Sequence, residues 1–208
     1  MLISRRNKFI FIHIYKNAGS SIRAALIDHA SSKSQRFLMK ICRRLHIRAR
    51  IIDHQPLAAH VKAKDVIDLL GENNFKNYYS FAIVRNPWDW QVSLYKFMLK
   101  NPNHHQHSII KRMKNFDEYI NWRCTEDVHF QKDFIYTDDG QLLVDFVGRF
   151  EQIDEDFTKI CSRIGIFASL PKLNVSNTIP YQEFYNSETK ALISKTFKPD
   201  ISLFKYNF

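Results

Sequence analysis

Glycine, cysteine and long apolar runs are scarce in this chain of 208 residues. The cysteines Cys42, Cys124 and Cys161 lie far apart and form no C-x-x-C pair, which argues against a disulfide framework and against a zinc cluster. No apolar run approaches the roughly 20 residues that span a bilayer, and no signal-peptide cleavage site follows the N-terminal residues. We therefore expect a cytoplasmic protein, in which each of the five glycines holds a special backbone position.

Acidic residues are almost missing from the first quarter of the chain. Residues 1–50 hold twelve Lys or Arg and one acid, Asp28, whereas the other 158 residues hold nineteen basic and twenty acidic residues. The formal net charge of +10 therefore originates in the first quarter. This asymmetry indicates a polyanionic ligand, which charge alone leaves open as a nucleotide, a nucleic acid, an anionic sugar or a lipid headgroup.

The hydrophobic content of 45% and aromatic content of 14% are ample for a core, and the length suits a single domain over residues 1–208. The patterns predict buried strands over 8–14, 78–84 and 142–150, and helices over 22–29, 63–70, 87–99, 116–122, 151–164 and 187–197. We expect Ser20 or Ser21 to cap the first helix, Gly71 to end the second and Pro199 to stop the last. Strands that alternate with helices imply an α/β fold with a parallel sheet.

Residues 33–50 carry seven Lys or Arg, and Phe37, Leu38, Ile41 and Leu45 follow one another at helical spacing. A basic amphipathic helix that contacts a membrane surface fits this pattern. A solvated surface helix with an ordinary buried stripe fits it equally well.

The first candidate for an anion site lies between the strand over 8–14 and the next helix. Its loop contains Lys16 and Gly19, and two hydroxyls, Ser20 and Ser21, stand at the helix start. Helix N-terminal N–H groups, the helix dipole and a lysine together favour a bound phosphate. The loop is not a Walker A sequence, because Lys16 precedes Gly19 instead of following the last glycine.

The second candidate repeats this arrangement after the strand over 78–84. Arg85 follows that strand, Pro87 starts a helix, and Ser93 lies two helical turns further on. The planar guanidinium of arginine suits a phosphate dianion, and a hydroxyl on the next helix can donate to the same group. Two anion sites after two strands indicate a ligand with separated anionic groups.

These motifs resemble those of the sulfotransferases that use 3′-phosphoadenosine 5′-phosphosulfate (PAPS), in the carbohydrate-type and bacterial branch. The family's phosphosulfate loop reads His-Ile-Pro-Lys-Thr-Gly-Gly-Thr-Ser, and residues 13–21 read His-Ile-Tyr-Lys-Asn-Ala-Gly-Ser-Ser. The family's 3′-phosphate motif, Val-Arg-(Asp/Asn)-Pro-Trp with a later Ser, is matched at Arg85 and Ser93. Similarity continues through residues 146–151 and 170–174, so most of the chain is covered.

The resemblance implies a P-loop-like three-layer fold with a central parallel sheet flanked by helices. It also implies PAPS as donor, with no metal. The residues that it assigns to donor binding are Lys16, Asn17, Ala18, Gly19, Ser20, Ser21, Arg85 and Ser93. Tyr15, Asn17 and Ala18 depart from the family's Pro, Thr and Gly. Asn17 tolerates left-handed geometry, whereas a positive φ at Ala18 would cost about 1 kcal/mol.

Sulfuryl transfer needs positioning, charge stabilisation and a base. We expect Lys16 to stabilise charge on the bridging oxygen of the departing nucleotide, as in the analogous phosphoryl transfers. A histidine suits the base near neutral pH. Residues 53–56 resemble a histidine-containing segment of bacterial members, which favours His54 as the base, with His60 as the alternative.

Two other function classes remain open from the residues alone. A nucleotide or small-molecule kinase on a related sheet is disfavoured by the absence of a lysine after the glycine. A non-catalytic module that binds RNA or an anionic membrane lacks an aromatic and basic RNA motif. For the enzyme, we expect a hydroxyl acceptor that is a glycan or glycolipid, no nucleic acid partner, and peripheral membrane contact through residues 33–50.

Overall fold

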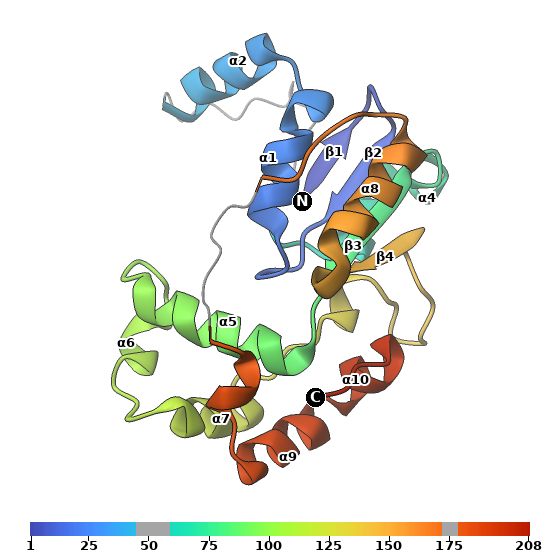
Figure 1. The fold of residues 1–208 in the computed structure, drawn as a ribbon. Helices are drawn as coiled ribbons and strands as arrows, with labels where there is room; N and C mark the ends of the chain where they lie inside the picture. Colours follow the sequence, from blue (N-terminus) through green and yellow to red (C-terminus); the bar gives the residue numbers. More distant parts are fainter. Residues whose placement is uncertain (45–58, 172–178) are drawn as a thin grey trace. The chain divides into compact units, whose positions relative to one another are not determined.

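The computed structural model describes residues 1–44, 59–171 and 179–208 (Figure 1). The chain divides into two compact units. The first unit comprises Met1–Val84 and Asp133–Leu173, and the second comprises Arg85–Lys132 and Asn174–Phe208. Compactness alone does not show whether either unit folds without the other, so the single domain over residues 1–208 stays a prediction.

The first unit contains a four-stranded sheet in the order β1-β2-β3-β4. Its strands are β1 (Leu2–Ser4), β2 (Phe9–Ile12), β3 (Tyr79–Val84) and β4 (Phe146–Arg149). β2 pairs with β3, and β3 with β4, in parallel, which confirms the predicted parallel pairing. β1 pairs with β2 in the antiparallel sense and was not predicted, because three residues are too few to show a pattern. β4 is shorter than the predicted strand over 142–150, since Leu142 forms only an isolated bridge with Tyr136.

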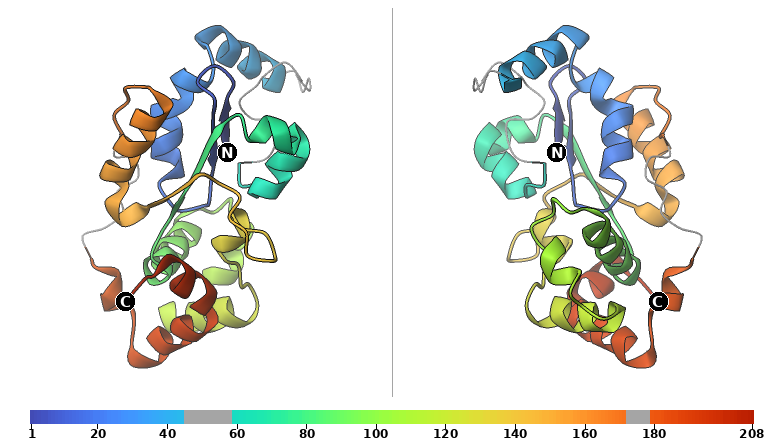
Figure 2. Two further views of the ribbon diagram at one scale, coloured as in Figure 1. Left: turned by 90° about the vertical axis from the view of Figure 1, so that its right-hand side faces the viewer. Right: turned by 90° about the vertical axis from the view of Figure 1, so that its left-hand side faces the viewer.

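Helices cover both faces of this sheet (Figure 2). α1 (Gly19–Ala30) and α8 (Ile153–Ile164) lie on one face, and α3 (Ala63–Leu70) and α4 (Glu72–Phe75) lie on the other. On the α1 side, the core consists of aromatic and aliphatic side chains from the sheet and both helices, among them Phe9, Phe11, Phe81, Ile22, Leu26, Phe157 and Ile160. The rings of Phe11 and Phe81 stack at 5.2 Å between centroids. The predicted α/β fold with helices on both sides of a central sheet is confirmed, with β1 as an antiparallel addition.

The first helix starts differently from the prediction. α1 begins at Gly19, its N-cap is Ala18, and no side chain caps it by a hydrogen bond. The expected cap by Ser20 or Ser21 is therefore wrong, because the chain enters the helix through a left-handed turn at Ala18 and both serines already lie inside the first turn. Gly71 ends α3 with a φ of 80°, as a glycine permits, although its ψ of 142° is not left-handed helical.

The second unit is helical. It contains α5 (Pro87–Lys100), α6 (His107–Ile110), α7 (Phe116–Thr125), the short 3₁₀ turn η3 (Tyr181–Phe184), α9 (Ser187–Thr196) and α10 (Lys198–Phe204). Its fully buried core residues include Trp90, Ile110, Tyr119, Ile120, Ile193 and Phe197. Pro199 does not stop the chain's last helix but lies in the first turn of α10, because a proline there loses no intrahelical hydrogen bond.

Three further elements complete the description. They are α2 (Lys33–Arg44), the 3₁₀ turn η1 (Lys132–Phe134) and the 3₁₀ turn η2 (Phe150–Gln152). α2 confirms the helical part of the predicted basic segment over residues 33–44, while residues 45–50 lie outside the described ranges. None of the described helices is long and apolar enough to cross a membrane.

Candidate active site

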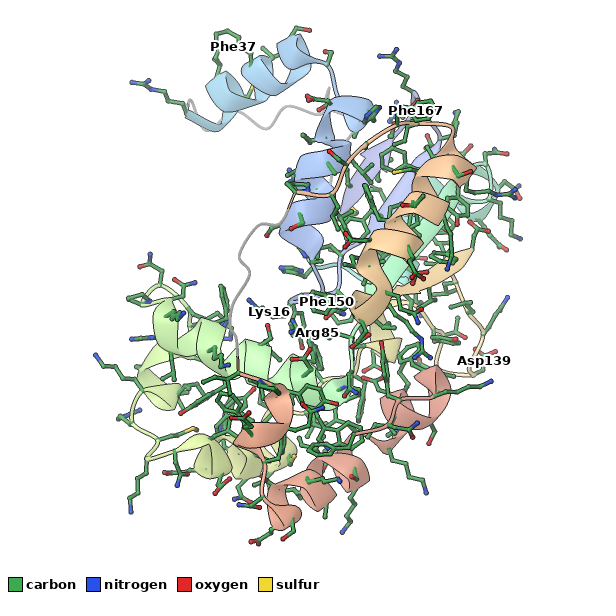
Figure 3. All side chains as sticks on the ribbon, viewed as in Figure 1. Lys16, Phe37, Arg85, Asp139, Phe150 and Phe167 are labelled. Carbon is green, nitrogen blue, oxygen red and sulfur yellow. The ribbon has the colours of Figure 1, made fainter. Side chains whose placement is uncertain are left out.

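The Lys16 loop, residues 13–18, follows β2 at the end of the sheet where the parallel strands finish (Figure 3). β2 lies between β1 and β3, and all four of its residues are buried. A fully apolar strand of this kind fixes the point at which the polar loop leaves the sheet. Lys16 is thereby placed directly before the N-terminus of α1.

Two non-glycine residues of the Lys16 loop have a positive φ. The φ of Lys16 is 65° and that of Ala18 is 56°. The positive φ considered for Ala18 on the sequence alone is present, and Lys16 adds a second such position that the sequence did not reveal. Left-handed geometry costs a residue with a Cβ roughly 1–2 kcal/mol, so packing must hold this loop in its bent form.

Asn17 supplies part of that packing. Its side chain is buried, and its Nδ2 donates a hydrogen bond of 2.8 Å to the carbonyl oxygen of Ile83 in β3. Asn17 does not have a positive φ itself, so its tolerance of left-handed geometry is not what the fold uses. Its amide instead ties the loop to the neighbouring strand.

The backbone at Gly19 lies directly against the ring of His13. A Cβ built on Gly19 would lie 1.6 Å from Nε2 of His13, so no other residue fits without moving that ring. The first turn of α1 contains no acidic residue. Because the first N–H groups of a helix have no partner within the helix, Gly19, Ser20 and Ser21 offer backbone donors to an anion next to Lys16.

Tyr15 stands where the family resemblance predicts a proline. Its ring meets His60 edge-to-face at 5.9 Å and Phe134 at 5.7 Å between centroids. These contacts restrain the residue before Lys16 by packing instead of by a proline ring. Phe134 was not predicted, since nothing local marks a phenylalanine of η1 as a neighbour of residue 15.

His60 lies beside the Lys16 loop. Its Nδ1 is 3.0 Å from the carbonyl oxygen of His13, and the two rings are 4.3 Å apart. A carbonyl oxygen only accepts, so the neutral His60 carries its proton on Nδ1 and its lone pair on Nε2. Burial lowers the pKa of His60, which keeps the ring neutral near pH 7. His60 thus presents a neutral ring with a lone pair on Nε2 beside the Lys16 loop.

His13 is the buried partner of His60. Burial, with further contributions from His60 and Arg23, lowers the pKa of His13 to about 2. Its ring stacks on Phe11 at 5.5 Å and fills the space beside Gly19. His13 therefore acts as an uncharged packing group. His54, the favoured base in the sequence interpretation, lies outside the described residues.

The second candidate site, in the second unit, starts at Arg85, which follows β3 in the chain. The backbone N–H of Arg85 donates to Oε1 of Gln131 at 2.9 Å, and Nε2 of Gln131 donates back to the carbonyl oxygen of Arg85 at 2.8 Å. The side-chain amide thus satisfies both backbone groups of Arg85, as a neighbouring strand would. Gln131 is fully buried, and no sequence motif marked it.

Gln131 is itself held by Asp200 of α10. The backbone N–H groups of Gln131 and Lys132 donate to the two carboxylate oxygens of Asp200, at 2.7 Å and 3.0 Å. Asp200 is fully buried, so these charge-assisted bonds are shielded from water. A line of hydrogen bonds therefore runs from α10 through Gln131 to Arg85.

The Arg85 side chain lies along α5. Its Nε donates to Oδ2 of Asp89 at 2.8 Å, and the exposed fractions of the two side chains are 12% and 22%. Ser93 is buried on the same helix, four residues after Asp89. Because residues four apart share a helix face, Ser93 lies on the same face of α5 as Asp89, to which Arg85 is bonded from its position before the helix.

Asn86 anchors the start of α5. Its Oδ1 accepts from the N–H of Trp88 at 3.1 Å, and its Nδ2 donates to the carbonyl oxygen of Asn207 at 2.7 Å and to the hydroxyl of Tyr181 at 3.2 Å. The ring of Phe208 meets Trp88 edge-to-face at 5.5 Å. Residues near position 207 therefore support the turn that carries Arg85.

Among the residues that the structure describes, histidine, cysteine, aspartate and glutamate side chains form no group of three that would suit a metal ion.

Comparison with known proteins decides the family. A family model described as "Sulfotransferase family" matches residues 1–207. The chain belongs to the sulfotransferase family. This membership confirms the resemblance, the expected enzyme class and sulfuryl transfer as the general reaction.

Two relatives of this sulfotransferase complete the comparison. An uncharacterized protein of Archaeoglobus fulgidus is 29% identical over 100 residues, which are 47% of this chain and 76% of the relative. The crystal structure of mouse sulfotransferase SULT7A1 complexed with PAP matches 99% of this chain and 91% of the mouse chain, with a TM-score of 0.55 and 15% identity. The mouse structure shows that the fold is shared.

Proposed function

We propose that this sulfotransferase moves the sulfuryl group of PAPS to a hydroxyl acceptor, with Lys16 at the phosphosulfate. The observation that carries the proposal is the Lys16 loop, which sets a lysine before a helix start without acidic residues. Backbone donors, the helix dipole and the lysine all favour an anion at this place. The mouse structure with the same fold is a complex with PAP, which supports the same nucleotide here.

Lys16 has an electrostatic role in the proposed reaction. Negative charge builds up on the bridging oxygen of the leaving nucleotide in a loose, in-line transfer. Lys16, with the first turn of α1, would stabilise that charge at the moment it forms. The bent loop suits this role because contacts within the protein hold it, namely the bond from Asn17 to β3 and the packing of His13 against Gly19.

Arg85 and Ser93 are proposed to bind the 3′-phosphate of the donor. Asp89 supports this assignment, because it lies on the same face of α5 as Ser93 and accepts a hydrogen bond from Nε of Arg85, which orients the guanidinium. The backbone of Arg85, held by Gln131, restricts the side chain further.

His60 is proposed as the base that accepts the acceptor's proton, and His54 stays the alternative from the resemblance. The lone pair on Nε2, the lowered pKa and the contact with Tyr15 support His60. His60→Gln should reduce kcat at least about 100-fold without weakening nucleotide binding, whereas His54→Gln should leave kcat near the parent value. The opposite result for the two variants would move the role to His54.

The acceptor is proposed to be a carbohydrate hydroxyl, on a glycan or glycolipid, as in the branch that the motifs resemble. The cytoplasm is the proposed compartment, with peripheral membrane contact through residues 33–50. Radiolabelled transfer from PAPS into a panel of glycans, glycolipids and phenols tests the acceptor. Label in phenols alone would contradict a carbohydrate acceptor.

Calorimetry tests the donor. Binding of 3′,5′-adenosine bisphosphate without magnesium, lost in Lys16→Ala and in Arg85→Ala, is the expected result. Magnesium-dependent ATP binding with no binding of the bisphosphate would instead favour a kinase. Binding of the bisphosphate that neither variant weakens would place the nucleotide elsewhere.

A further inference from the structure

The first observation concerns α2. Its twelve residues contain five Lys or Arg and no acid. Phe37 is 68% exposed, and Leu38 and Ile41 are exposed as well. Positions 37, 38 and 41 fall on one side of a helix, so α2 has an exposed apolar face. All charged side chains of this helix are positive.

A second, separate segment adds another exposed aromatic. Phe167, three residues after the end of α8, is 100% exposed, whereas its neighbour Ile166 is buried in the core. Ile166 thus anchors the loop while Phe167 stands out from it. An exposed phenylalanine on an anchored loop is costly in water, and it becomes favourable when an apolar phase covers it.

Both segments lie at the same end of the first unit. α1 starts at the Lys16 loop and ends next to α2, and α8 starts after β4 and ends before Phe167. In Figure 3, Phe37 and Phe167 accordingly stand at the end of this unit opposite Lys16. The turn between β1 and β2, residues 5–8, lies at that end too and exposes Arg5, Arg6 and Lys8. We call residues 5–8, α2 and Phe167 the basic end.

Charge and exposed apolar surface together restrict what can cover the basic end. An RNA would use the cations, but it gains little from exposed leucine and isoleucine, because RNA-binding sites stack bases on aromatic rings. A second copy of this chain would bring the same positive charge, and Asp28 is the single acid in residues 1–50. An anionic bilayer satisfies both features, since cations meet headgroups while Phe, Leu and Ile enter the acyl boundary.

We propose that the basic end binds the surface of an anionic phospholipid membrane, with Phe37, Leu38, Ile41 and Phe167 inserted. The proposal extends the membrane contact proposed above for residues 33–50 to Phe167 and residues 5–8 and names its lipid class, and it does not rest on sulfuryl transfer. α1, at 1.5 Å per residue over its twelve residues, separates α2 from the Lys16 loop by about 18 Å. Membrane binding therefore leaves the nucleotide site in contact with water, and the two activities are separable.

Vesicle flotation of the full chain tests the proposal. The protein should bind vesicles of phosphatidylcholine with phosphatidylglycerol, not vesicles of phosphatidylcholine alone, and added salt should weaken the binding. The triple variant Phe37→Ser, Leu38→Ser, Ile41→Ser should reduce the bound fraction about tenfold or more, and Phe167→Ser about threefold. Arg6→Gln with Arg44→Gln should weaken binding and flatten its salt dependence.

Matched controls come from the second unit. Leu203→Ser removes a similarly exposed leucine, and Lys195→Gln with Lys198→Gln removes two exposed cations; both should bind like the parent. Calorimetry with 3′,5′-adenosine bisphosphate in every variant reports folding and the nucleotide site separately from vesicle binding. If the parent binds the bisphosphate but not the vesicles, only the membrane proposal fails.

Three further outcomes would overturn the proposal. The first is equal binding to neutral vesicles, and the second is unchanged vesicle binding by the triple variant. The third is binding of another partner by a protein that does not bind vesicles. That partner would be an RNA oligonucleotide that binds through the same cations, or a second copy of the chain in a dimer that light scattering detects and the triple variant dissociates. Each outcome assigns the basic end to something other than an anionic membrane.

Discussion

The Lys16 loop and the Arg85 turn both follow parallel strands of one sheet, but different forces hold them. The Lys16 loop is held mainly by packing, with His13 against Gly19 and Tyr15 against His60 and Phe134, and by one hydrogen bond from Asn17 to β3. The Arg85 turn is held mainly by hydrogen bonds, from the Gln131 side chain to the backbone of Arg85 and from the Asn86 side chain to the backbone of Asn207.

Gln131 lies 46 positions from Arg85, and Asn207 lies 121 positions from Asn86. The difference indicates that a single added carbon disturbs the first site, whereas the loss of a distant donor or acceptor disturbs the second. Each of the following predictions changes one side of this comparison.

The largest effect is expected at Lys16. Lys16→Ala should lower kcat for sulfuryl transfer about 100- to 1000-fold, because one preorganised charge at the leaving group has an effect of that size. Lys64→Ala, in an exposed position of α3, is the matched control and should keep the parent rate. A Lys16→Ala enzyme with parental kcat at saturating donor would remove the proposed role.

Gly19→Ala tests the packing of the first site. The new Cβ would overlap the His13 ring, so the free energy of unfolding should fall by about 3 kcal/mol. Gly140→Ala is the control: Gly140 has a positive φ but no atom near the added Cβ, and it should lose only about 1 kcal/mol. Urea denaturation measures both, and equal losses would mean that His13 moves away freely.

Gln131→Leu tests the hydrogen bonds of the second site. It leaves two backbone groups of Arg85 without their partner, so the free energy of unfolding should fall by about 2 kcal/mol. The dissociation constant of 3′,5′-adenosine bisphosphate should rise about tenfold, while kcat at saturating donor changes little. Gln182→Leu, an exposed position of η3, should alter none of the three quantities. A variant that lowers kcat alone would contradict the division of roles.

Acid should weaken the first site through His13. The folded pKa of His13 is about 2 against 6.5 in an unfolded chain, so the unfolded state takes up the proton first as the pH falls. Stability is therefore complete above pH 6.5 and declines below it, by about 2 kcal/mol for this group near pH 5. His13→Gln should flatten the pH dependence of the free energy of unfolding in that window; a slope equal to the parent's would assign the acid sensitivity elsewhere.

The smallest effect is expected at Ala18. Ala18→Gly should raise the free energy of unfolding by up to about 1 kcal/mol, because glycine adopts the left-handed conformation without strain. Ala25→Gly, inside α1, should lower it by about 1 kcal/mol and serves as the control. If both variants lower the free energy of unfolding, the positive φ at Ala18 carries no strain that glycine could relieve.

How far the sequence predicts this molecule depends on the range of the interactions. β2, β3, α1 and α5 were predictable because buried apolar runs and helical spacing are local signals. The chain order alone placed two site residues, Lys16 and Gly19, after β2, and two others, Arg85 and Ser93, after β3.

Contacts between distant segments were not predictable. No local signal links Gln131 or Asp200 to Arg85, or Phe134 to Tyr15. The expected serine cap was wrong because the left-handed entry at Ala18 depends on the packing of His13 and Asn17, which belongs to the folded sheet and not to the helix sequence. The hydrogen bond from Asn17 to Ile83 was not predictable for the same reason.

The division of the chain has a practical consequence for dissecting the protein. The polypeptide leaves the first unit after Val84, returns after Lys132 and leaves it again after Leu173, so each unit is assembled from two separate stretches. No single truncation yields either unit by itself: a fragment that ends at Val84 or Lys132 lacks part of the first unit, and one that ends at Leu173 still carries residues 85–132 of the second. Isolated pieces of this enzyme would have to be recombined as complementing fragments, or joined by circular permutation, before either half could be studied alone.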